Sequence, residues 1–306
     1  MQKWNAGFSD YAPFGRGAAP AGRTAYVNGR YLPHGEAGVH IEDRGLQLAD
    51  SVYEVCNVRG GKMLDLEEHL DRLERSLGII HMAMPMGRAA LKHVMAEIVR
   101  RNRVAQGLIY LQVTRGAVRR DHAIPDHPPR PSLVITARST PDSAARKFET
   151  GIKAITRPDE RWARCDIKTT QLLPNLLART AAKRAGAGEA LLVDRDGFIT
   201  EAAGANLWII DAAGDVVTRN LGTDILPGVT RRVVMEAAAA EGLAVTERKF
   251  TLAEALAARE AFLTSANGAA VPVVEIDGRA ISDGKPGPVG RRIRALYLSR
   301  AEGKAR

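Results

Sequence analysis

Cysteine is almost absent from the sequence, and so are long apolar runs. Cys56 and Cys165 are the only cysteines, and they lie far apart without the spacing of metal ligands, which argues against a disulfide framework and a zinc site. We expect both to be buried thiols. No segment is apolar over the length needed to cross a bilayer, and residues 1–24 contain no apolar run typical of signal peptides. These absences predict a soluble cytoplasmic protein with no metal ion and no membrane partner.

A glycine-rich strand-to-helix fingerprint is also missing, which argues against a nicotinamide-dependent dehydrogenase. The chain does have 306 residues and an apolar fraction of 45%, enough for two ordinary domains. Its formal net charge is +9, which a nucleic-acid partner would explain. The arginines, however, are scattered through segments typical of ordinary helices and strands, and no nucleic-acid-binding module is recognisable. We therefore expect no nucleic-acid partner and attribute the basic surface to solubility and to attraction of anionic ligands.

Changes in composition divide the chain into an arm, two domains and a connecting segment. Residues 1–24 are rich in Gly, Ala, Pro and Arg without periodicity, which is typical of an N-terminal extension outside the fold. Residues 139–148 are polar, contain Pro141 and separate two strand signals, so we predict a linker there. Residues 25–138 would then form a smaller α/β domain, and residues 149–306 a larger, cofactor-binding one.

Local patterns within these limits predict both strands and helices, and hence an α+β fold. Asn28-Gly29 lies between two short strand-like pieces and predicts a hairpin. Asp65 followed by Glu68 resembles a capping box, at the start of a helix whose leucines recur at helical spacing over 66–77. In chain order we then expect a helix at 91–98, strands at 108–114, 132–137 and 152–156, a helix after Pro174, strands at 190–193, 198–200, 207–210 and 216–218, a helix at 230–240, strands at 261–264 and 271–276, and a final basic helix.

Three positions in the second domain could carry chemistry. Lys168 has apolar and strand-compatible neighbours and is either an ordinary surface lysine or a desolvated one, whose lowered pKa leaves a neutral amine that can attack an aldehyde. Glu201 closes a hairpin, where it would either point inward to a ring nitrogen or lie on the surface. Gly228 and Thr230 stand where a turn runs into a helix, whose N–H groups can bind an anion while Thr230 serves as ligand or as N-cap. The local pattern alone leaves both interpretations open at each position.

Taken together and in order, several motifs resemble those of the fold type IV pyridoxal-phosphate-dependent aminotransferases. The likeness extends from about Ala25 to the last helix. The motifs are Glu42-Asp-Arg-Gly-Leu-Gln-Leu-Ala-Asp-Ser-Val-Tyr53, Glu68-His69-Leu-Asp-Arg72, Arg164-Cys-Asp-Ile-Lys168, Thr200-Glu201 with Asn206 after it, and Gly228-Val-Thr230-Arg231. The resemblance implies two α/β domains joined by a short linker, with pyridoxal 5′-phosphate between them.

The resemblance also implies a role for each matching residue. Lys168 would be the Schiff-base lysine and the base that moves the Cα proton of the substrate. Glu201 would pair with the pyridine nitrogen and keep it protonated. The phosphate would be held by Arg72, Thr230 and the backbone of Val229, and by the backbone at Ala266, where the family usually has a hydroxyl.

Arg120 and His122 follow the strand expected at 108–114, and an Arg-x-His pair there resembles the signature of D-amino-acid transaminases. With Tyr53, and with His69 nearby, this pair would trap the substrate carboxylate, because a guanidinium offers a planar fork to a carboxylate. In that family the neighbouring subunit contributes the loop, so the resemblance implies a homodimer. It further implies D-alanine or D-glutamate as donor and 2-oxoglutarate or pyruvate as acceptor.

Some positions depart from the family pattern, and other activities stay open. Ala202-Ala-Gly-Ala-Asn206 replaces a glycine and serine run, and Ala266 replaces a hydroxyl, so we expect altered cofactor affinity or substrate range. Branched-chain L-amino-acid transaminases, 4-amino-4-deoxychorismate lyases and R-selective amine transaminases share the cofactor residues and are alternatives. A basic anion- or RNA-binding protein is the alternative from another class, although it would not explain the ordered motifs.

Overall fold

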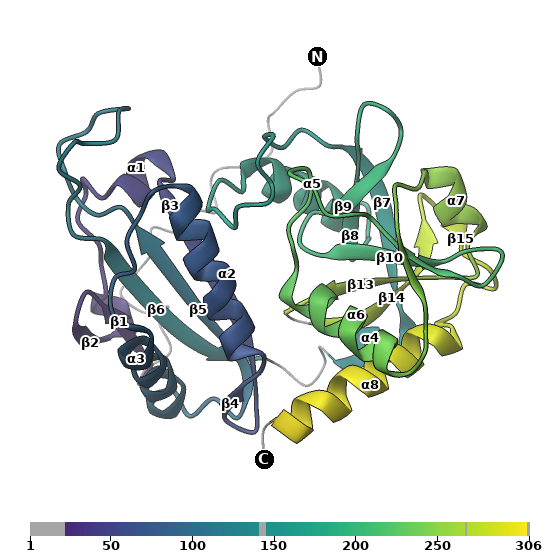
Figure 1. The fold of residues 1–306 in the computed structure, drawn as a ribbon, viewed down its shortest axis with the longest axis horizontal. Coiled ribbons are helices and arrows are strands. Elements are labelled where there is room, and N and C mark those ends of the chain that lie inside the picture. The colour runs from purple at the N-terminus through teal and green to yellow at the C-terminus, as the bar shows by residue number, and fades with distance from the viewer. Residues whose placement is uncertain (1–21, 141–144, 267, 305–306) are drawn as a thin grey trace.

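The computed structural model describes residues 22–140, 145–266 and 268–304, which form two lobes (Figure 1). Each lobe contains a sheet with helices packed on it, as the predicted α+β two-domain fold requires. Nearly all of the predicted arm, residues 1–24, lies outside the described residues, as do 141–144 within the predicted linker. The last residues of that linker are helical, because α4 begins at Arg146.

The first domain contains a six-stranded antiparallel sheet in the order β2-β1-β6-β5-β3-β4. The hairpin predicted at Asn28-Gly29 is confirmed, and φ angles of 47° and 93° give both residues the left-handed backbone that a tight hairpin turn needs. β3, which the sequence patterns did not predict, pairs with β5 along its whole length. The strands are β1 (Thr24–Val27), β2 (Arg30–Pro33), β3 (Ser51–Arg59), β4 (Lys62–Met63), β5 (Gln106–Thr114) and β6 (Ser132–Ser139).

Two long helices, α2 (Leu66–Ile79) and α3 (Arg88–Arg101), share one apolar core with this sheet; α1 (Arg44–Leu48) and a 3-10 turn (His34–Glu36) are shorter. The capping box predicted for α2 is wrong, because the side chain of Asp65 makes no capping hydrogen bond. Capping residues usually have extended backbone, whereas Asp65 has a φ of 50°. Its Oδ2 instead accepts a hydrogen bond of 2.9 Å from the Tyr297 hydroxyl, which ties the start of α2 to the last helix of the second domain.

The second domain contains a nine-stranded mixed sheet in the order β12-β11-β10-β13-β14-β7-β8-β9, with β15 paired to β14. The pairs β11–β12, β14–β7 and β7–β8 are parallel and the others antiparallel. The strands are β7 (Ile152–Pro158), β8 (Glu189–Val193), β9 (Ile199–Ala202), β10 (Asn206–Ile210), β11 (Val216–Thr218), β12 (Val245–Glu247), β13 (Glu260–Ser265), β14 (Gly268–Ile276) and β15 (Arg279–Ala280).

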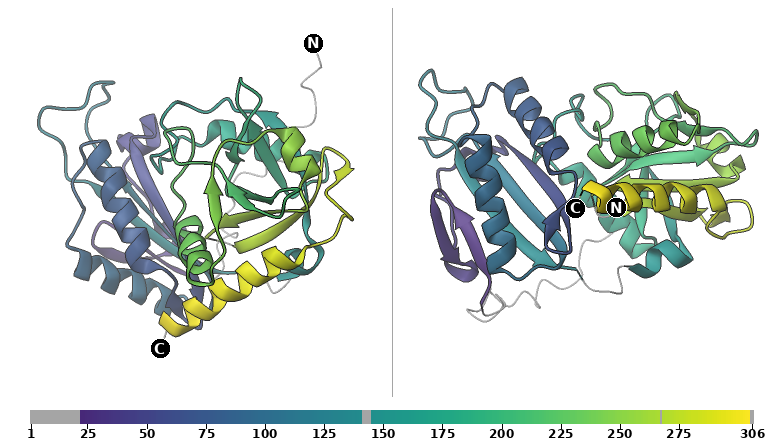
Figure 2. Two further views of the ribbon diagram at one scale, coloured as in Figure 1. Left: turned by 45° about the vertical axis from the view of Figure 1, so that its right-hand side comes forward. Right: turned by 60° about the horizontal axis from the view of Figure 1, so that its bottom comes forward.

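Two helices of the second domain, α6 (Val229–Ala240) and α8 (Pro288–Lys304), lie at the boundary with the first domain. α6 begins beside α2, and α8 packs on α6 and β14 (Figure 2). The other helices are α4 (Arg146–Thr150), α5 (Leu173–Arg184) and α7 (Leu252–Ala257). Within the described part of the chain, no helix has both the length and the apolar character that spanning a membrane requires.

Candidate active site

A cavity of about 220 Å³ lies between the two domains, and both contribute to its wall. The cavity brings together most of the residues that the sequence singled out, although they come from β3, α2, the segment before α5, β9, the start of α6 and the turn after β13. They are Tyr53, His69, Arg72, Lys168, Glu201, Val229, Thr230 and Ala266. Arg120 and His122 are not among the lining residues.

Lys168 is fixed to the first domain through its backbone. The N–H of Tyr53 donates a hydrogen bond of 2.9 Å to the Lys168 carbonyl, and the N–H of Thr170 donates one of 3.3 Å to the Ser51 carbonyl. The segment therefore adds to the edge of β3 as a short antiparallel bridge. The side chain is half-buried, with Nζ 4.4 Å from the centre of the Tyr53 ring. This pairing places the primary amine of Lys168 in the cavity, at a position set by the sheet of the first domain.

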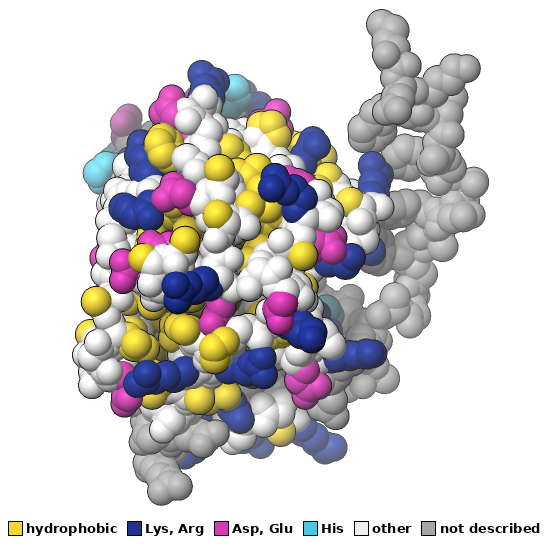
Figure 3. All heavy atoms as spheres, turned by 90° about the vertical axis from the view of Figure 1, so that its right-hand side faces the viewer, with side chains coloured by type: hydrophobic (Ala, Val, Ile, Leu, Met, Phe, Trp, Pro, Cys, Tyr) yellow, Lys and Arg dark blue, Asp and Glu magenta, His cyan; other side chains and the backbone are white. Residues whose placement is uncertain are grey.

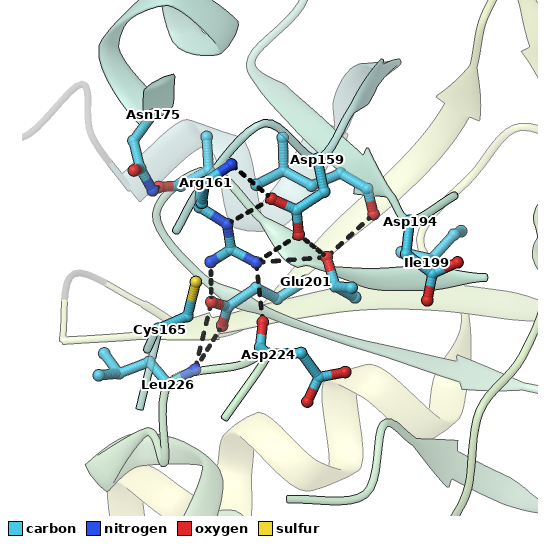
Figure 4. A network of polar contacts seen from close by, with 12 residues as sticks. Asp159, Arg161, Cys165, Asn175, Asp194, Ile199, Glu201, Asp224 and Leu226 are labelled. Atoms are coloured by element: carbon cyan, nitrogen blue, oxygen red, sulfur yellow. Dashed lines mark hydrogen bonds and ion pairs between the residues drawn. The ribbon is translucent and has the colours of Figure 1, made fainter. Parts of the chain in front are cut away.

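Glu201 is a buried carboxylate on β9 that also lines the cavity and is 5% exposed. Its oxygens accept a hydrogen bond from Asn206 Nδ2 at 2.9 Å. The N–H of Leu226 also donates to them at 3.2 and 3.3 Å, and Arg161 forms an ion pair with the carboxylate (Figure 4). Burial raises the pKa of Glu201 to about 7, against the opposing effect of Arg161. The carboxyl group can therefore exchange a proton near neutral pH.

The partner of Glu201 was not found from the sequence. Arg161 uses the other side of its guanidinium to make a fork on Asp159, with Nε–Oδ1 at 2.9 Å and Nη2–Oδ2 at 2.7 Å, and it also donates to the Asp224 carbonyl at 2.9 Å (Figure 4). The only signal in the sequence is a pair of opposite charges that follows the strand β7, and many surface loops contain such pairs. The three-dimensional pairing with Glu201 is what distinguishes it.

Arg72 lines the cavity from α2 and is held by a buried carboxylate, Glu54. Arg72 donates to Glu54 through Nε and Nη2 at 2.7 and 2.8 Å, and His69 Nδ1 lies 2.7 Å from the same carboxylate. Burial would raise the pKa of Glu54, but Arg72 and His69 outweigh it and lower the pKa to about 2. The remaining nitrogen of Arg72, Nη1, donates to the Pro227 carbonyl at 3.2 Å, so the guanidinium lies beside the start of α6.

The start of α6 has the form of an anion site. Val229 and Thr230 are the first residues of the helix, and its unpaired N–H groups and positive dipole end favour a negatively charged ligand. Gly228 precedes them, and a Cβ at this position would come within 2.1 Å of Asn206 Oδ1. Only glycine therefore lets the backbone approach Asn206 this closely. Ala266 adds a further backbone segment to the wall, and its carbonyl accepts from Asn57 Nδ2 at 3.1 Å.

The cavity thus offers a primary amine, a buried carboxylate and an anion site. An aldehyde, a ring nitrogen and a phosphate on one small ligand would match these three groups, and pyridoxal 5′-phosphate carries all of them. The residues present therefore fit this cofactor. In residues 22–140, 145–266 and 268–304, no group of three or more His, Cys, Asp or Glu side chains is suited to a metal ion.

Arg120 and His122 lie on the exposed loop between β5 and β6, with Arg120 Nη2 at 3.5 Å from His122 Nε2. His122 lines a second hollow of about 450 Å³, and this hollow shares Trp162, Thr169 and Gln171 with the cavity of Lys168. The structure of one chain therefore does not bring Arg120 and His122 together with Tyr53 around a common space.

Comparison with known proteins agrees with this geometry. The family model described as amino-transferase class IV matches residues 51–276. The chain is 37% identical over 273 residues to the D-alanine aminotransferase of Listeria monocytogenes, covering 89% of this chain and 94% of that protein. It is 38% identical over 268 residues to the D-alanine aminotransferase of Bacillus licheniformis, covering 87% and 93%.

Solved structures show the same fold. The branched-chain amino acid aminotransferase of Escherichia coli aligns with a TM-score of 0.81 at 24% identity, covering 92% of this chain and 95% of that one. A branched-chain amino acid aminotransferase of T.th., solved with pyridoxamine 5′-phosphate, aligns with a TM-score of 0.81 at 27% identity and the same coverage. On the strength of the family match, the identities and the arrangement of its cavity, this chain belongs to the amino-transferase class IV family.

Proposed function

We propose that the protein is a D-amino-acid transaminase that transfers the amino group of D-alanine or D-glutamate to a 2-oxo acid such as 2-oxoglutarate or pyruvate. Its cofactor is pyridoxal 5′-phosphate, as in other class IV aminotransferases. The observation that carries the proposal is the cavity in which Lys168, Glu201 and the start of α6 meet. The choice of D-amino acids is supported by the Arg120-x-His122 motif and by the names of the similar proteins.

Each of three groups that line the cavity would hold one part of the cofactor. Lys168 would bind it covalently through the aldehyde carbon, and Glu201 would face the ring nitrogen. Arg72, Thr230 and the N–H groups of Val229 and Ala266 would hold the phosphate. Arg161 would act as a positioning residue for Glu201, because its fork on Asp159 fixes the direction of the ion pair.

When bound, pyridoxal phosphate supplies an aldehyde that takes up the amino group and a ring that accepts the electron pair left on Cα. The chain itself has to move one proton. Lys168 Nζ would take it from the substrate Cα and return it on the cofactor side, as a general base and then a general acid. The ionised form of Glu201 would keep the ring nitrogen protonated, and a pKa near 7 allows this carboxyl group to respond to a positive neighbour.

Stereochemistry would follow from two fixed points. Lys168 removes only a hydrogen that points toward its own side of the cavity, and the substrate carboxylate determines which hydrogen that is. We propose that Tyr53, Arg120 and His122 bind the carboxylate, with His69 nearby, and that Arg120 and His122 come from the neighbouring subunit of a homodimer. Two observations support this: the pair lies on an exposed loop, and it does not line the cavity of its own chain.

The experiment that tests the proposal is the visible absorbance spectrum of the protein with bound pyridoxal phosphate, recorded before and after D-alanine and, separately, L-leucine. A spectrum that converts to the pyridoxamine form with D-alanine alone supports a D-amino-acid transaminase. Conversion with L-leucine alone would instead show a branched-chain transaminase, the activity named for the similar solved structures. Conversion with neither would leave the lyase and the R-amine transaminase.

The non-enzymatic alternative is an anion- or RNA-binding protein, and the surface gives it little support. On the face of the second domain shown in Figure 3, Lys and Arg side chains lie among acidic and apolar ones instead of forming one continuous patch. Many of the arginines are also paired, such as Arg88 with Glu67 and Asp71. Purified protein that takes up no pyridoxal phosphate would favour this alternative.

A further inference from the structure

The loop that carries Arg120 and His122 is exposed, but a buried arginine of another segment holds its backbone. Arg44, the first residue of α1, is only 3% exposed. Its Nη1 donates to the carbonyl of Asp121 at 2.7 Å and to that of Ala123 at 3.2 Å. These two carbonyls stand on either side of His122, so a single guanidinium fixes the chain at the residue we assign to substrate binding.

Arg44 is itself held in place by a shared carboxylate. Its Nε donates to Asp50 Oδ2 at 2.7 Å, and the same oxygen accepts from Arg115 Nε at 2.7 Å. Arg115 is 1% exposed and donates to the carbonyls of Ile80 and His81, at the end of α2. Burial raises the pKa of Asp50, but Arg115 and Arg44 outweigh it and lower the pKa, so the carboxylate stays ionised between them.

The first half of the loop also makes backbone contacts with the segment around Arg44. The N–H of Arg44 donates to the Gly116 carbonyl at 2.9 Å, and the N–H of Val118 donates to the Glu42 carbonyl at 3.3 Å. These backbone contacts hold the loop only as far as Val118. From Asp121 to Ala123 the guanidinium of Arg44 replaces them, and charged donors make stronger hydrogen bonds than neutral ones.

We propose that Arg44 is a positioning residue for recognition of the substrate carboxylate. By holding the backbone on both sides of His122, it sets where Arg120 and His122 stand, and therefore how well a substrate carboxylate fits between them. The proposal rests on the proposed function, because the position of this loop matters only if Arg120 and His122 bind substrate. Displacement of a binding group by about 1 Å is enough to weaken a productive complex severely.

The test is Arg44→Lys in the full-length holoenzyme. A lysine keeps the positive charge beside Asp50 but lacks the planar guanidinium that reaches Asp50 and both carbonyls at once, so the fold should survive. We expect KM for D-alanine to rise about tenfold while kcat changes less than about twofold. The apparent dissociation constant of D-alaninol, which has the same skeleton without a carboxylate, should not change when it is measured from the cofactor absorbance.

A matched control is Arg23→Lys, because Arg23 also donates to a backbone carbonyl of the first sheet, that of Ala137 at 3.0 Å. It should leave KM unchanged. As an independent readout, amide hydrogen exchange over 119–124 should become faster in Arg44→Lys and stay unchanged in the control.

Arg120→Ala separates the positioning role of Arg44 from the carboxylate trap itself. If Arg120→Ala raises KM for D-alanine and Arg44→Lys does not, the positioning role is refuted while the proposed carboxylate trap stands. If Arg44→Lys weakens D-alanine and D-alaninol equally, its effect is general and the positioning role is also refuted. If Arg120→Ala leaves KM unchanged, the trap itself is wrong and the role of Arg44 falls with it.

Discussion

At the scale of single residues, two buried glutamates in the site, Glu54 and Glu201, each pair with an arginine and yet have opposite pKa shifts. Glu54 receives two nitrogens of Arg72 together with His69, and its pKa falls to about 2. Glu201 receives one nitrogen of Arg161, whose other side is engaged by Asp159, and burial raises its pKa to about 7. Glu54 is therefore a permanent anion that holds Arg72, whereas Glu201 is able to titrate.

The raised pKa of Glu201 predicts a pH-dependent stability of the cofactor-free protein. Between its ordinary pKa of 4.5 and about 7, the unfolded chain loses this proton while the folded chain keeps it, so the contribution of Glu201 to stability is present below 4.5 and is lost as pH rises through 7. Glu201→Gln should remove this loss. The difference in melting temperature between the variant and wild type, measured by calorimetry, should move in favour of the variant from pH 5 to pH 8. A constant difference would show that Glu201 does not titrate in this range.

Lys168→Ala is expected to abolish turnover with D-alanine, because no other lysine is among the described residues that line the cavity and could take the Cα proton. The visible absorbance of the covalently held cofactor should disappear as well, while a reduced amount of cofactor still binds through Arg72 and the start of α6. Lys183→Ala, at an exposed position of α5, is the control and should retain both activity and absorbance. Full turnover in Lys168→Ala would remove this lysine from the mechanism.

Single residues of the site could be predicted to different extents. Lys168, Glu201 and Thr230 were predicted as site residues because they stand in ordered motifs, and all three line the same cavity. Arg161 and Glu54 were missed as site residues because their importance lies in which carboxylate or guanidinium they face, and pairing across a fold leaves no periodic signal in the chain. The exposed position of Arg120 and His122 relative to the cavity likewise depends on three-dimensional arrangement.

At the scale of elements, the N-termini of α3 and α6 form a natural pair for comparison. Each is preceded by glycine in an extended conformation, Gly87 with φ −61° and Gly228 with φ −63°. No atom lies within 4 Å of a Cβ built on Gly87, whereas one on Gly228 would come within 2.1 Å of Asn206. Their backbone requirements are therefore equal, and their surroundings are not.

This pair predicts that Gly228→Ala weakens cofactor binding while Gly87→Ala does not. In the first variant Asn206 has to move and loses its hydrogen bond to Glu201, and the start of α6 shifts. We expect the dissociation constant of pyridoxal phosphate, measured by absorbance titration, to rise about tenfold, comparable to the loss of one hydrogen bond to a charged group. Equal affinities for the two variants would exclude the close approach at Gly228 as a requirement.

Elements with a clear hydrophobic periodicity or a local turn signal could be predicted from the sequence. Features that depend on contacts between distant parts of the chain could not. The leucines of α2 recur at helical spacing, and the Asn28-Gly29 turn has a local cause, so both were identified. β3 was missed because it alternates only between buried and half-buried positions and carries polar site residues such as Glu54 and Asn57. The cap of α2 was wrong because Asp65 bonds to Tyr297, which follows it by 232 residues.

At the scale of the whole molecule, α5 has an exposed apolar surface that no described segment covers. Leu173, Leu176 and Leu177 are 67%, 58% and 56% exposed, and neighbouring apolar side chains of this size are typical of interfaces. We expect Leu176→Glu to convert the proposed homodimer to a monomer in analytical ultracentrifugation and to lose activity with D-alanine.

The monomer should still bind pyridoxal phosphate, because Lys168, Glu201 and Arg72 belong to one chain. Leu221→Glu, at another exposed leucine with 51% exposure, is the control and should remain dimeric and active. A fully active monomer would show that the carboxylate trap is not contributed by the partner, and a dimeric Leu176→Glu would place the interface elsewhere.

The bridge between Lys168 and β3 also has a consequence for folding. β4 pairs only with the end of β3. At Ser51–Tyr53, the same edge of β3 is covered by residues 168–170 of the second domain. An open strand edge invites pairing with other chains, and this one stays open until a segment 119 residues later in the chain docks on it. Contacts of such separation form late, so in refolding the cofactor absorbance should recover after the far-ultraviolet circular dichroism, and simultaneous recovery would contradict this order. A nascent chain would then be most prone to aggregate in the interval before Lys168 docks on the first domain.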